Sequence, residues 1–428
     1  MHEGIRDSIS HHKVAAGGAY LSVERGLILC SSMSNGISPH QDNPTSALSW
    51  WSQLNSGILS GDIWDMSTSI PHERRTAQEP RQDMLYRVHL SSITQVNPTI
   101  RILRLNVGRG PTYCHKDQKN ECEVCLNPTL LTVLFNQNQS KPFHFLAGQW
   151  LDVHVPSVPQ AGGFTITSTP SDALSLKNDS NSNETTEFPY IELAVQESPS
   201  NPPAAWLWRP KDEILGQELA VRVGGSFIWP PPDIPLEDIG RVVFVAGGVG
   251  INPLISMISH IFKDPSKLSH SPAIHLLYST RSPTQPGPGG EDISKHLDQV
   301  LFFPRLRNIL HSQQPQPQPH SQHRRQQQQE DRFLRLQFHL YITNLHEMPG
   351  NLPADFSLHK RRIKTTDLHE VIGGKREAIR NGYRSKGCRT VCYICGPPDM
   401  TDELVAGAEE VLGAGVGKEK SVFYEKWW

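Results

Sequence analysis

The sequence predicts two folded domains: a small antiparallel β-barrel, followed by a doubly wound α/β domain with a parallel sheet. Residues 87–90 and 100–105 alternate apolar and polar side chains, as half-buried strands do. Residues 242–246 are continuously apolar, which is typical of a strand buried on both faces. Residues 1–83 show neither pattern and are rich in Ser, His, Gly and Gln. We therefore expect a disordered or poorly packed extension there.

The barrel domain is expected to span residues 84–236. Gly, Pro or Asn clusters separate its short apolar segments, and this spacing is typical of a barrel of about six strands. Beyond the two alternating segments, strands are predicted over residues 130–135, 150–155, 163–168, 190–195 and 218–223. The polar residues 175–186 are predicted to form a surface insertion.

The α/β domain is expected to span residues 237–428, because strand-like and helix-like segments alternate there. After residues 242–246, strands are predicted over residues 274–279, 336–343, 391–395 and 422–427. Helices are predicted over residues 251–262, 292–302, 366–380 and 401–412. Residues 312–330 are almost all Gln, Pro, His and Arg, and they are predicted to form a low-complexity insertion without a core.

Composition and charge exclude several classes of protein. The formal net charge of −2 gives no overall attraction for nucleic acid or an anionic membrane. The sequence has no run of 18 apolar residues, so we expect no membrane span, and its start lacks the pattern of a signal peptide. The seven cysteines, an odd number, favour reduced thiols in an intracellular protein.

The strongest motif is Gly247-Gly248-Val249-Gly250, followed by Ile251-Asn252-Pro253. It ends a buried strand and opens a helix. Backbone amides at such a turn bind phosphate, and glycine lets a dinucleotide diphosphate approach closely. Taken alone, this turn is as consistent with a structural tight turn as with a binding site.

A second turn, Cys395-Gly396-Pro397-Pro398-Asp399-Met400, also connects a predicted strand to a helix. Since ligands of open α/β sheets bind at the carboxyl ends of the strands, both turns are expected at one edge. Cys392 and Cys395 are three residues apart on a strand, so their side chains point to opposite faces. We therefore do not interpret them as a redox dithiol.

The chain ends in Glu425-Lys426-Trp427-Trp428. A terminal pair of tryptophans is equally consistent with a hydrophobic plug and with a flat cover over a ring-shaped ligand.

Between the strands predicted over residues 100–105 and 130–135 lie four side chains of the types that bind zinc: Cys114, His115, Cys122 and Cys125. The last two have the spacing of zinc ligands, but the adjacent pair Cys114 and His115 is an awkward donor set. We favour a plain surface loop and predict no metal. The spacing also differs from that of a plant-type iron–sulfur cluster.

Together these motifs resemble the ferredoxin–NADP reductase superfamily over residues 84–428, apart from the insertions. Ala147-Gly148-Gln149-Trp150 and the segment from Gly163 to Pro170 resemble two further strands of that family. The resemblance implies a barrel that binds FAD and an α/β domain that binds NAD or NADP. It implies an NAD(P)H-dependent flavin oxidoreductase that passes electrons to a separate acceptor. It also implies a mitochondrial location, with the cytoplasm as the alternative.

The resemblance also assigns residues. Cys395, Glu425 and Thr165 would lie at the reacting atoms, with Thr165 near the flavin N5. Phe164 would pack on the flavin, and Trp427 or Trp428 would stack on its ring. Other cofactor contacts would come from Ile166, Thr167, Gly247, Gly248, Val249, Gly250, Pro253, Gly396, Pro397, Pro398 and Met400. Arg281 follows the second strand of the domain, where it would either contact the adenosine ribose or its phosphate or lie free in solvent.

The sequence departs from the family at the flavin strand. Gly162 stands where the family has an Arg that pairs with the FAD diphosphate, and Phe164 replaces a Tyr. The segment Asn201 to Leu207 lacks the family's hydroxyl ligand. Loss of one charge-assisted contact, worth about 1.5–3 kcal/mol, weakens binding by roughly one to two powers of ten. The alternative is a non-catalytic NAD(P)-binding or interaction module that has lost tight flavin binding.

Overall fold

The computed structural model contains two compact units, residues 1–63 and residues 64–428. In the first unit the described residues form a three-stranded antiparallel sheet of β1 (Ala15–Ala16), β2 (Ala19–Glu24) and β3 (Leu27–Ser31). In the second unit the structure describes residues 71–107, 143–174, 188–268, 272–283, 296–313, 334–345, 354–373, 389–413 and 420–427.

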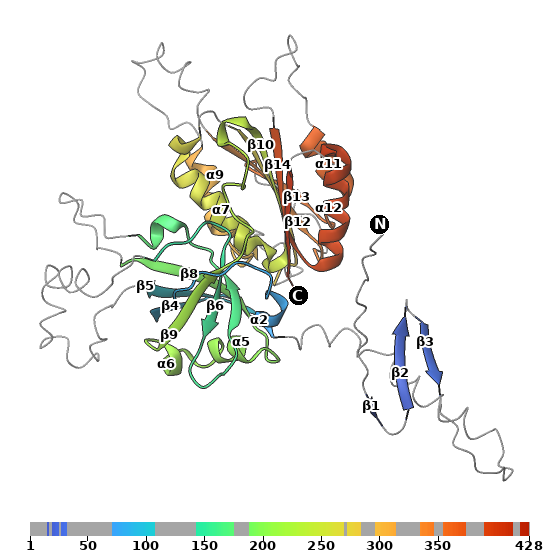
Figure 1. Ribbon diagram of the computed structural model, residues 1–428. Coiled ribbons are helices and arrows are strands. Elements are labelled where there is room, and N and C mark those ends of the chain that lie inside the picture. Colours follow the sequence, from blue (N-terminus) through green and yellow to red (C-terminus); the bar gives the residue numbers. More distant parts are fainter. Residues whose placement is uncertain are drawn as a thin grey trace, which may run out of the picture. The chain divides into compact units, whose positions relative to one another are not determined.

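The predicted barrel is present as six antiparallel strands in the order β7-β6-β9-β4-β5-β8 (Figure 1). A bridge between Ile166 and Leu193 joins the two edge strands β7 and β8. The strands are β4 (Tyr86–Asn97), β5 (Ile100–Val107), β6 (Trp150–His154), β7 (Gly162–Thr165), β8 (Tyr190–Gln196) and β9 (Glu218–Gly224). Two short helices, α5 (Pro202–Leu207) and α6 (Lys211–Ile214), lie between β8 and β9. The strand expected over residues 130–135 lies outside the described residues.

The strand predicted over residues 163–168 ends earlier, at Thr165, because the chain changes partner there. The Ile166 amide donates to the Gln149 carbonyl (3.0 Å), whereas the Thr167 amide donates to the Glu192 carbonyl (2.8 Å). The segment after Thr165 therefore passes from β6 to β8 and connects the two edges of the barrel.

Residues 71–83, which the sequence pattern placed in the extension, pack against the barrel. Their anchor is Asp152 of β6, a fully buried carboxylate. It contacts Arg81 (2.9 Å) and Arg222 (2.7 Å), and His72 of helix α2 (His72–Arg75) lies 3.2 Å away. A buried carboxylate needs such partners, so the N-terminal residues His72 and Arg81 are part of the barrel's structure.

The predicted doubly wound domain is also present, with a parallel sheet in the order β13-β12-β11-β10-β14-β15. Figure 1 shows α7 and α9 on one face and α11 and α12 on the other. The strands are β10 (Ile239–Gly247), β11 (Ala273–Thr280), β12 (Arg335–Ile342), β13 (Ser357–His359), β14 (Arg389–Gly396) and β15 (Val422–Lys426). The helices are α7 (Ile251–Lys263), α9 (Phe303–Ser312), α11 (Thr365–Gly373) and α12 (Pro398–Leu412).

Of the helix expected over residues 292–302, residues 292–295 lie outside the described residues, residues 296–297 are helical, and residues 298–302 form turns and a bend before α9 begins at Phe303. The buried face of α9 is formed by Phe303, Leu306 and Leu310, which have helical spacing. Pro304 lies in its first turn, where proline is well tolerated. No helix in the described part of the chain is long and apolar enough to cross a membrane.

Candidate functional site

The two predicted turns lie side by side at the carboxyl edge of the parallel sheet. Ala246 of β10 pairs with Cys395 of β14, so Gly247–Gly250 and the residues after Cys395 leave the sheet together. A Cβ on Gly250 would overlap the Cys395 carbonyl, and one on Gly247 would lie 2.7 Å from the Met400 sulfur. Glycine is required at these positions because the two turns approach so closely.

Gly248 has a different environment from these two glycines. Its φ is +54°, and a Cβ built there would meet nothing within 4 Å among the described residues. The one-turn segment Gly248–Gly250 runs directly into the 13-residue helix α7. The open space therefore lies beside backbone amides at a helix start, an arrangement that fits a diphosphate.

Cys395 faces the space behind these turns as a neutral thiol. It is fully buried, and it is paired in register with Glu425 of β15. Burial raises its pKa well above the usual range, and the Glu425 carboxylate raises it further. Cys395 is therefore a weak nucleophile.

Glu425 is held in an unusual state for a carboxyl group. Burial raises its pKa to about 8, and the charge of Glu79 contributes in the same direction. Its Oε2 is enclosed and has no hydrogen-bond partner among the described residues. At neutral pH this side chain carries a proton, and it has an unsatisfied oxygen available for a ligand.

Trp427 lies beside this pair. Its backbone amide donates to the Gly396 carbonyl (3.0 Å), and its half-buried ring packs against the core. Its enclosed indole nitrogen makes no hydrogen bond of good geometry in the described part of the structure, but it lies near Cys395 and Glu425 and lowers the pKa of both. Trp428 lies outside the described residues.

The two cysteines of β14 face opposite sides of the sheet, as predicted. Cys392 belongs to the core under α11 and α12, whereas Cys395 belongs to the core under α7 and α9. Both are free thiols.

Thr165, the last residue of β7, is 1% exposed. It pairs with Trp150 of β6, on the strand face opposite to Phe164. Its hydroxyl has no hydrogen-bond partner in the described residues, and such an orphaned group fits a ligand atom.

Phe164 and Gly162 are both buried in β7. Phe164 is 7% exposed and packs in the barrel core, and Ile166 lies in the same core. A Cβ on Gly162 would lie 2.5 Å from the Phe164 ring and 2.7 Å from Pro203 of α5. The space that the family's Arg side chain would need is therefore filled.

Of the remaining residues predicted to contact a cofactor, some lie near the glycine turn and others do not. Pro253 is buried in the first turn of α7, next to the glycine turn. Arg281 is exposed just beyond β11, two residues after Ser279, which pairs with Gly247. Thr167 is fully buried, and its hydroxyl donates to the Glu192 carboxylate (3.0 Å). Residues 114–125, which include the cysteines of the zinc hypothesis, lie outside the described residues.

Sequence reasoning missed the residues that join the barrel to the α/β domain. Asn252 of α7 donates to the Ala194 carbonyl (3.1 Å), and Ser256 donates to the Ser168 carbonyl (2.7 Å). A usable signal was present in Glu192, the one acidic residue of the otherwise apolar segment 190–195. A charge in such a strand requires a partner from elsewhere.

A six-stranded antiparallel barrel followed by a parallel sheet with a glycine turn after its first strand is the arrangement that the sequence predicted. No family model matches the sequence. Curated homologues carry the name Oxidoreductase NAD-binding domain-containing protein 1. The one from Danio rerio is 28% identical over 363 residues, covering 83% of this chain and 97% of that protein. The one from Homo sapiens is 25% identical over 364 residues, covering 83% of this chain and 84% of that protein. These relatives confirm the resemblance noted in the sequence.

The chain also aligns with solved structures of low sequence identity. A ferredoxin NADP+ reductase from Neisseria gonorrhoeae with bound FAD and NADP is 12% identical, covering 81% of this chain and 99% of that one, with a TM-score of 0.45. The cytochrome b5 reductase domain of Ulva prolifera nitrate reductase is 15% identical, covering 80% of this chain and 97% of that one, with a TM-score of 0.44.

Proposed function

We propose that the protein is an NAD(P)H-dependent flavin oxidoreductase that transfers electrons to a separate acceptor. The observation that carries this proposal is the packing of the Gly247–Gly250 turn against Cys395, with open space at Gly248. The curated homologues bear oxidoreductase and NAD-binding names, which supports the same class.

The residues would have distinct roles. The amides of Gly248–Gly250 would bind the dinucleotide diphosphate, and Cys395 would pack beside the nicotinamide as a neutral thiol. Glu425 would hold a proton next to it, and the Thr165 hydroxyl would donate to a flavin nitrogen. When bound, the two cofactors supply the hydride chemistry itself, whereas the protein supplies proximity and excludes water.

The proposal is tested with the full chain, supplied with FAD and titrated with NADH or NADPH without oxygen. Loss of the flavin's yellow absorbance supports the proposed function. Gly248→Ala is the matched control, because its methyl group enters the proposed diphosphate space without overlapping a neighbouring group. A wild-type protein that takes up no FAD and leaves NAD(P)H unoxidised would contradict the proposal.

One observation favours the alternative, a non-catalytic NAD(P)-binding module. Phe164 and Pro203 fill the space beside Gly162, so the cation that would hold the FAD diphosphate has no place there. This alternative predicts that the wild-type protein binds NADH or NADPH but takes up no flavin, so the same titration separates the two functions.

A further inference from the structure

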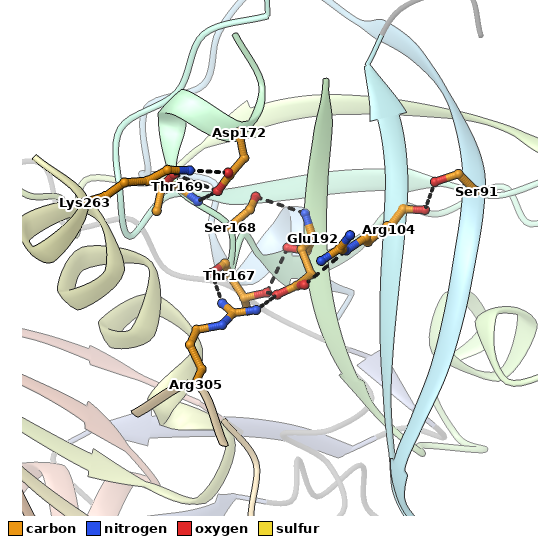
Figure 2. Close-up of polar contacts among 9 residues, drawn as sticks. All are labelled: Ser91, Arg104, Thr167, Ser168, Thr169, Asp172, Glu192, Lys263 and Arg305. Carbon is orange, nitrogen blue, oxygen red and sulfur yellow. Dashed lines mark hydrogen bonds and ion pairs between the residues drawn. The ribbon is translucent and has the colours of Figure 1, made fainter. Parts of the chain in front are cut away.

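The segment between β7 and the loop after η2 (Pro170–Asp172) is held from two directions (Figure 2). From the barrel, Glu192 of β8 binds it. The Thr167 amide donates to the Glu192 carbonyl, the Thr167 hydroxyl donates to its carboxylate, and the Glu192 amide donates to the Ser168 hydroxyl (3.0 Å). Arg104 of β5 also lies 3.6 Å from the Glu192 carboxylate.

From the α/β domain, three side chains reach the same short segment. Arg305 of α9 donates to the Thr167 carbonyl (3.0 Å) and to the Glu192 carboxylate (2.5 Å). Ser256 of α7 donates to the Ser168 carbonyl, and Lys263 at the end of α7 pairs with Asp172. We call Thr167, Ser168, Asp172, Glu192, Ser256, Lys263 and Arg305 the interdomain network.

Arg305 contacts both Thr167 and Glu192 in this network. Its side chain is 31% exposed, whereas that of Glu192 is 3% exposed. Its guanidinium also lies 4.9 Å from the centre of the Phe302 ring. Phe302 has a φ of +62°, an unfavourable backbone conformation for an aromatic residue. Strain of this kind persists only where the surrounding structure enforces it, here at the residue that precedes α9.

The network connects the two halves of the proposed site. Thr165, whose hydroxyl is orphaned, lies two residues before Thr167. Helix α7, which carries Ser256 and Lys263, begins directly after Gly250. At about 1.5 Å per residue, Lys263 is roughly 20 Å from the glycine turn, so this end of the network is remote from the reacting atoms.

From this arrangement we infer that Arg305 and Glu192 are positioning residues, which fix Thr165 relative to the glycine turn and so set the geometry of hydride transfer. This inference rests on the proposed function. The planar fork of Arg305 makes two directed bonds at once, to a carbonyl and to a carboxylate, and lysine cannot reproduce both. A polar cavity of about 440 Å³ lies beside the network, so removal of Arg305 leaves room for the domains to shift.

The test compares Arg305→Gln with Arg307→Gln. Arg307 lies on the same helix and pairs with Asp298 inside the α/β domain (3.0 Å), so its loss leaves the interdomain network intact. Arg305→Gln is expected to lower kcat for flavin reduction by about tenfold or more, since a small misplacement costs rate steeply. Its KM for NAD(P)H should stay within about twofold, because the glycine turn is untouched. Arg305→Lys should recover part of kcat.

Wild-type kcat in Arg305→Gln would overturn the inference, as would an equal loss of kcat in Arg307→Gln. A second measurement does not depend on turnover. Hydrogen exchange of residues 166–172 should slow when NADPH or NADH binds wild type, and this slowing should disappear in Arg305→Gln. Binding without any change in exchange would contradict the coupling even if flavin reduction is observed.

Failure of the proposed function itself has a different signature. If wild type binds neither NADH nor NADPH, the proposed function is wrong, and the network is judged by thermal unfolding alone. If wild type unfolds in one transition and Arg305→Gln unfolds in two, the result supports the role of Arg305 in joining the two domains. If Arg305→Gln also unfolds in one unchanged transition, that role is wrong.

Discussion

Glu425 lies directly opposite Cys395 in the parallel pairing of β14 and β15, and both the Cys395 side chain and the Glu425 Oε2 atom are shielded from water. The Cys395 thiol and the Glu425 carboxyl are thus neighbours in a buried environment that disfavours the charged form of each. The pKa of each is raised, and burial is the largest cause for each. The pair therefore carries two protons at neutral pH, which suits a site that receives a neutral ring.

The first prediction concerns pH and Glu425. Its pKa rises from 4.5 to about 8 on folding, so the unfolded chain loses this proton at lower pH than the native protein does. The stabilisation is complete below the unfolded value, falls as the pH rises towards about 8, and is lost above it. Glu425→Gln should therefore be more stable than wild type under alkaline conditions, and this advantage should vanish in acid. Denaturant unfolding across this range measures the difference. A constant difference at all pH values would show that folding leaves the pKa of Glu425 unchanged.

The second prediction separates the two kinds of glycine in the first turn. Gly248→Ala places a methyl group in open space, so the chain should fold with a cost of about 1–2 kcal/mol from its positive φ. The methyl group would enter the space proposed for the diphosphate, so NADPH and NADH should bind at least tenfold more weakly by calorimetry, about 1.4 kcal/mol. Gly250→Ala instead overlaps the Cys395 carbonyl and should lose stability first, as a fall in melting temperature. Unchanged affinity in Gly248→Ala would place the diphosphate elsewhere.

The third prediction concerns Asp152. Burial alone would raise its pKa, but its contacts with His72, Arg81 and Arg222 outweigh burial and hold the pKa well below 3.8. The resulting stabilisation is present above pH 3.8 and is lost as the pH falls towards the folded-state value. Asp152→Asn should cost about 3–5 kcal/mol at neutral pH, because two arginines lose their partner. It should also release residues 71–83 to proteolysis.

A matched control for Asp152 is Glu218→Gln. Glu218 faces Arg87 at 3.6 Å, and both side chains are largely exposed. An ion pair of this kind contributes about 0–1 kcal/mol, so this variant should unfold almost as wild type does. Equal losses of unfolding free energy in the two variants would show that burial of Asp152 does not govern the attachment of residues 71–83.

Sequence reasoning identified the features that depend on local pattern. The apolar run before Gly247 predicted a buried parallel strand, and the glycine turn predicted the edge where Cys395 lies. It did not find the attachment of His72 and Arg81, because a buried ion pair between residues 71 positions apart leaves no periodic signal. The partners of Arg305 were missed for the same reason, since they come from the other domain.

The sequence showed that Gly162 replaces the family's Arg, but it did not show what fills the space of that side chain. The absence of a cation follows from the identity of residue 162 alone, whereas the position of the Phe164 ring does not. By strand alternation Phe164 shares a face with Gly162, and the structure shows that this face lies in the barrel core. Only the packing shows that Phe164 and Pro203 close over Gly162, so a compensating side chain has no room at that position.

The last prediction follows from this packing. If no cation holds the diphosphate end of FAD at Gly162, FAD gains little over FMN, and the two flavins should bind with dissociation constants within about tenfold of each other, 1.4 kcal/mol. Gly162→Arg should not strengthen FAD binding, because its side chain would displace Phe164 from the barrel core and destabilise the fold by about 1–3 kcal/mol. Titration of the full chain with FAD and FMN, followed by fluorescence, measures both constants, and melting temperature reports the cost of the substitution. A dissociation constant for FAD that is a hundredfold lower than that for FMN would mean that another cation binds the diphosphate. Arg209, which lies 6.0 Å from the Trp206 ring just beyond α5, is then the first residue to substitute.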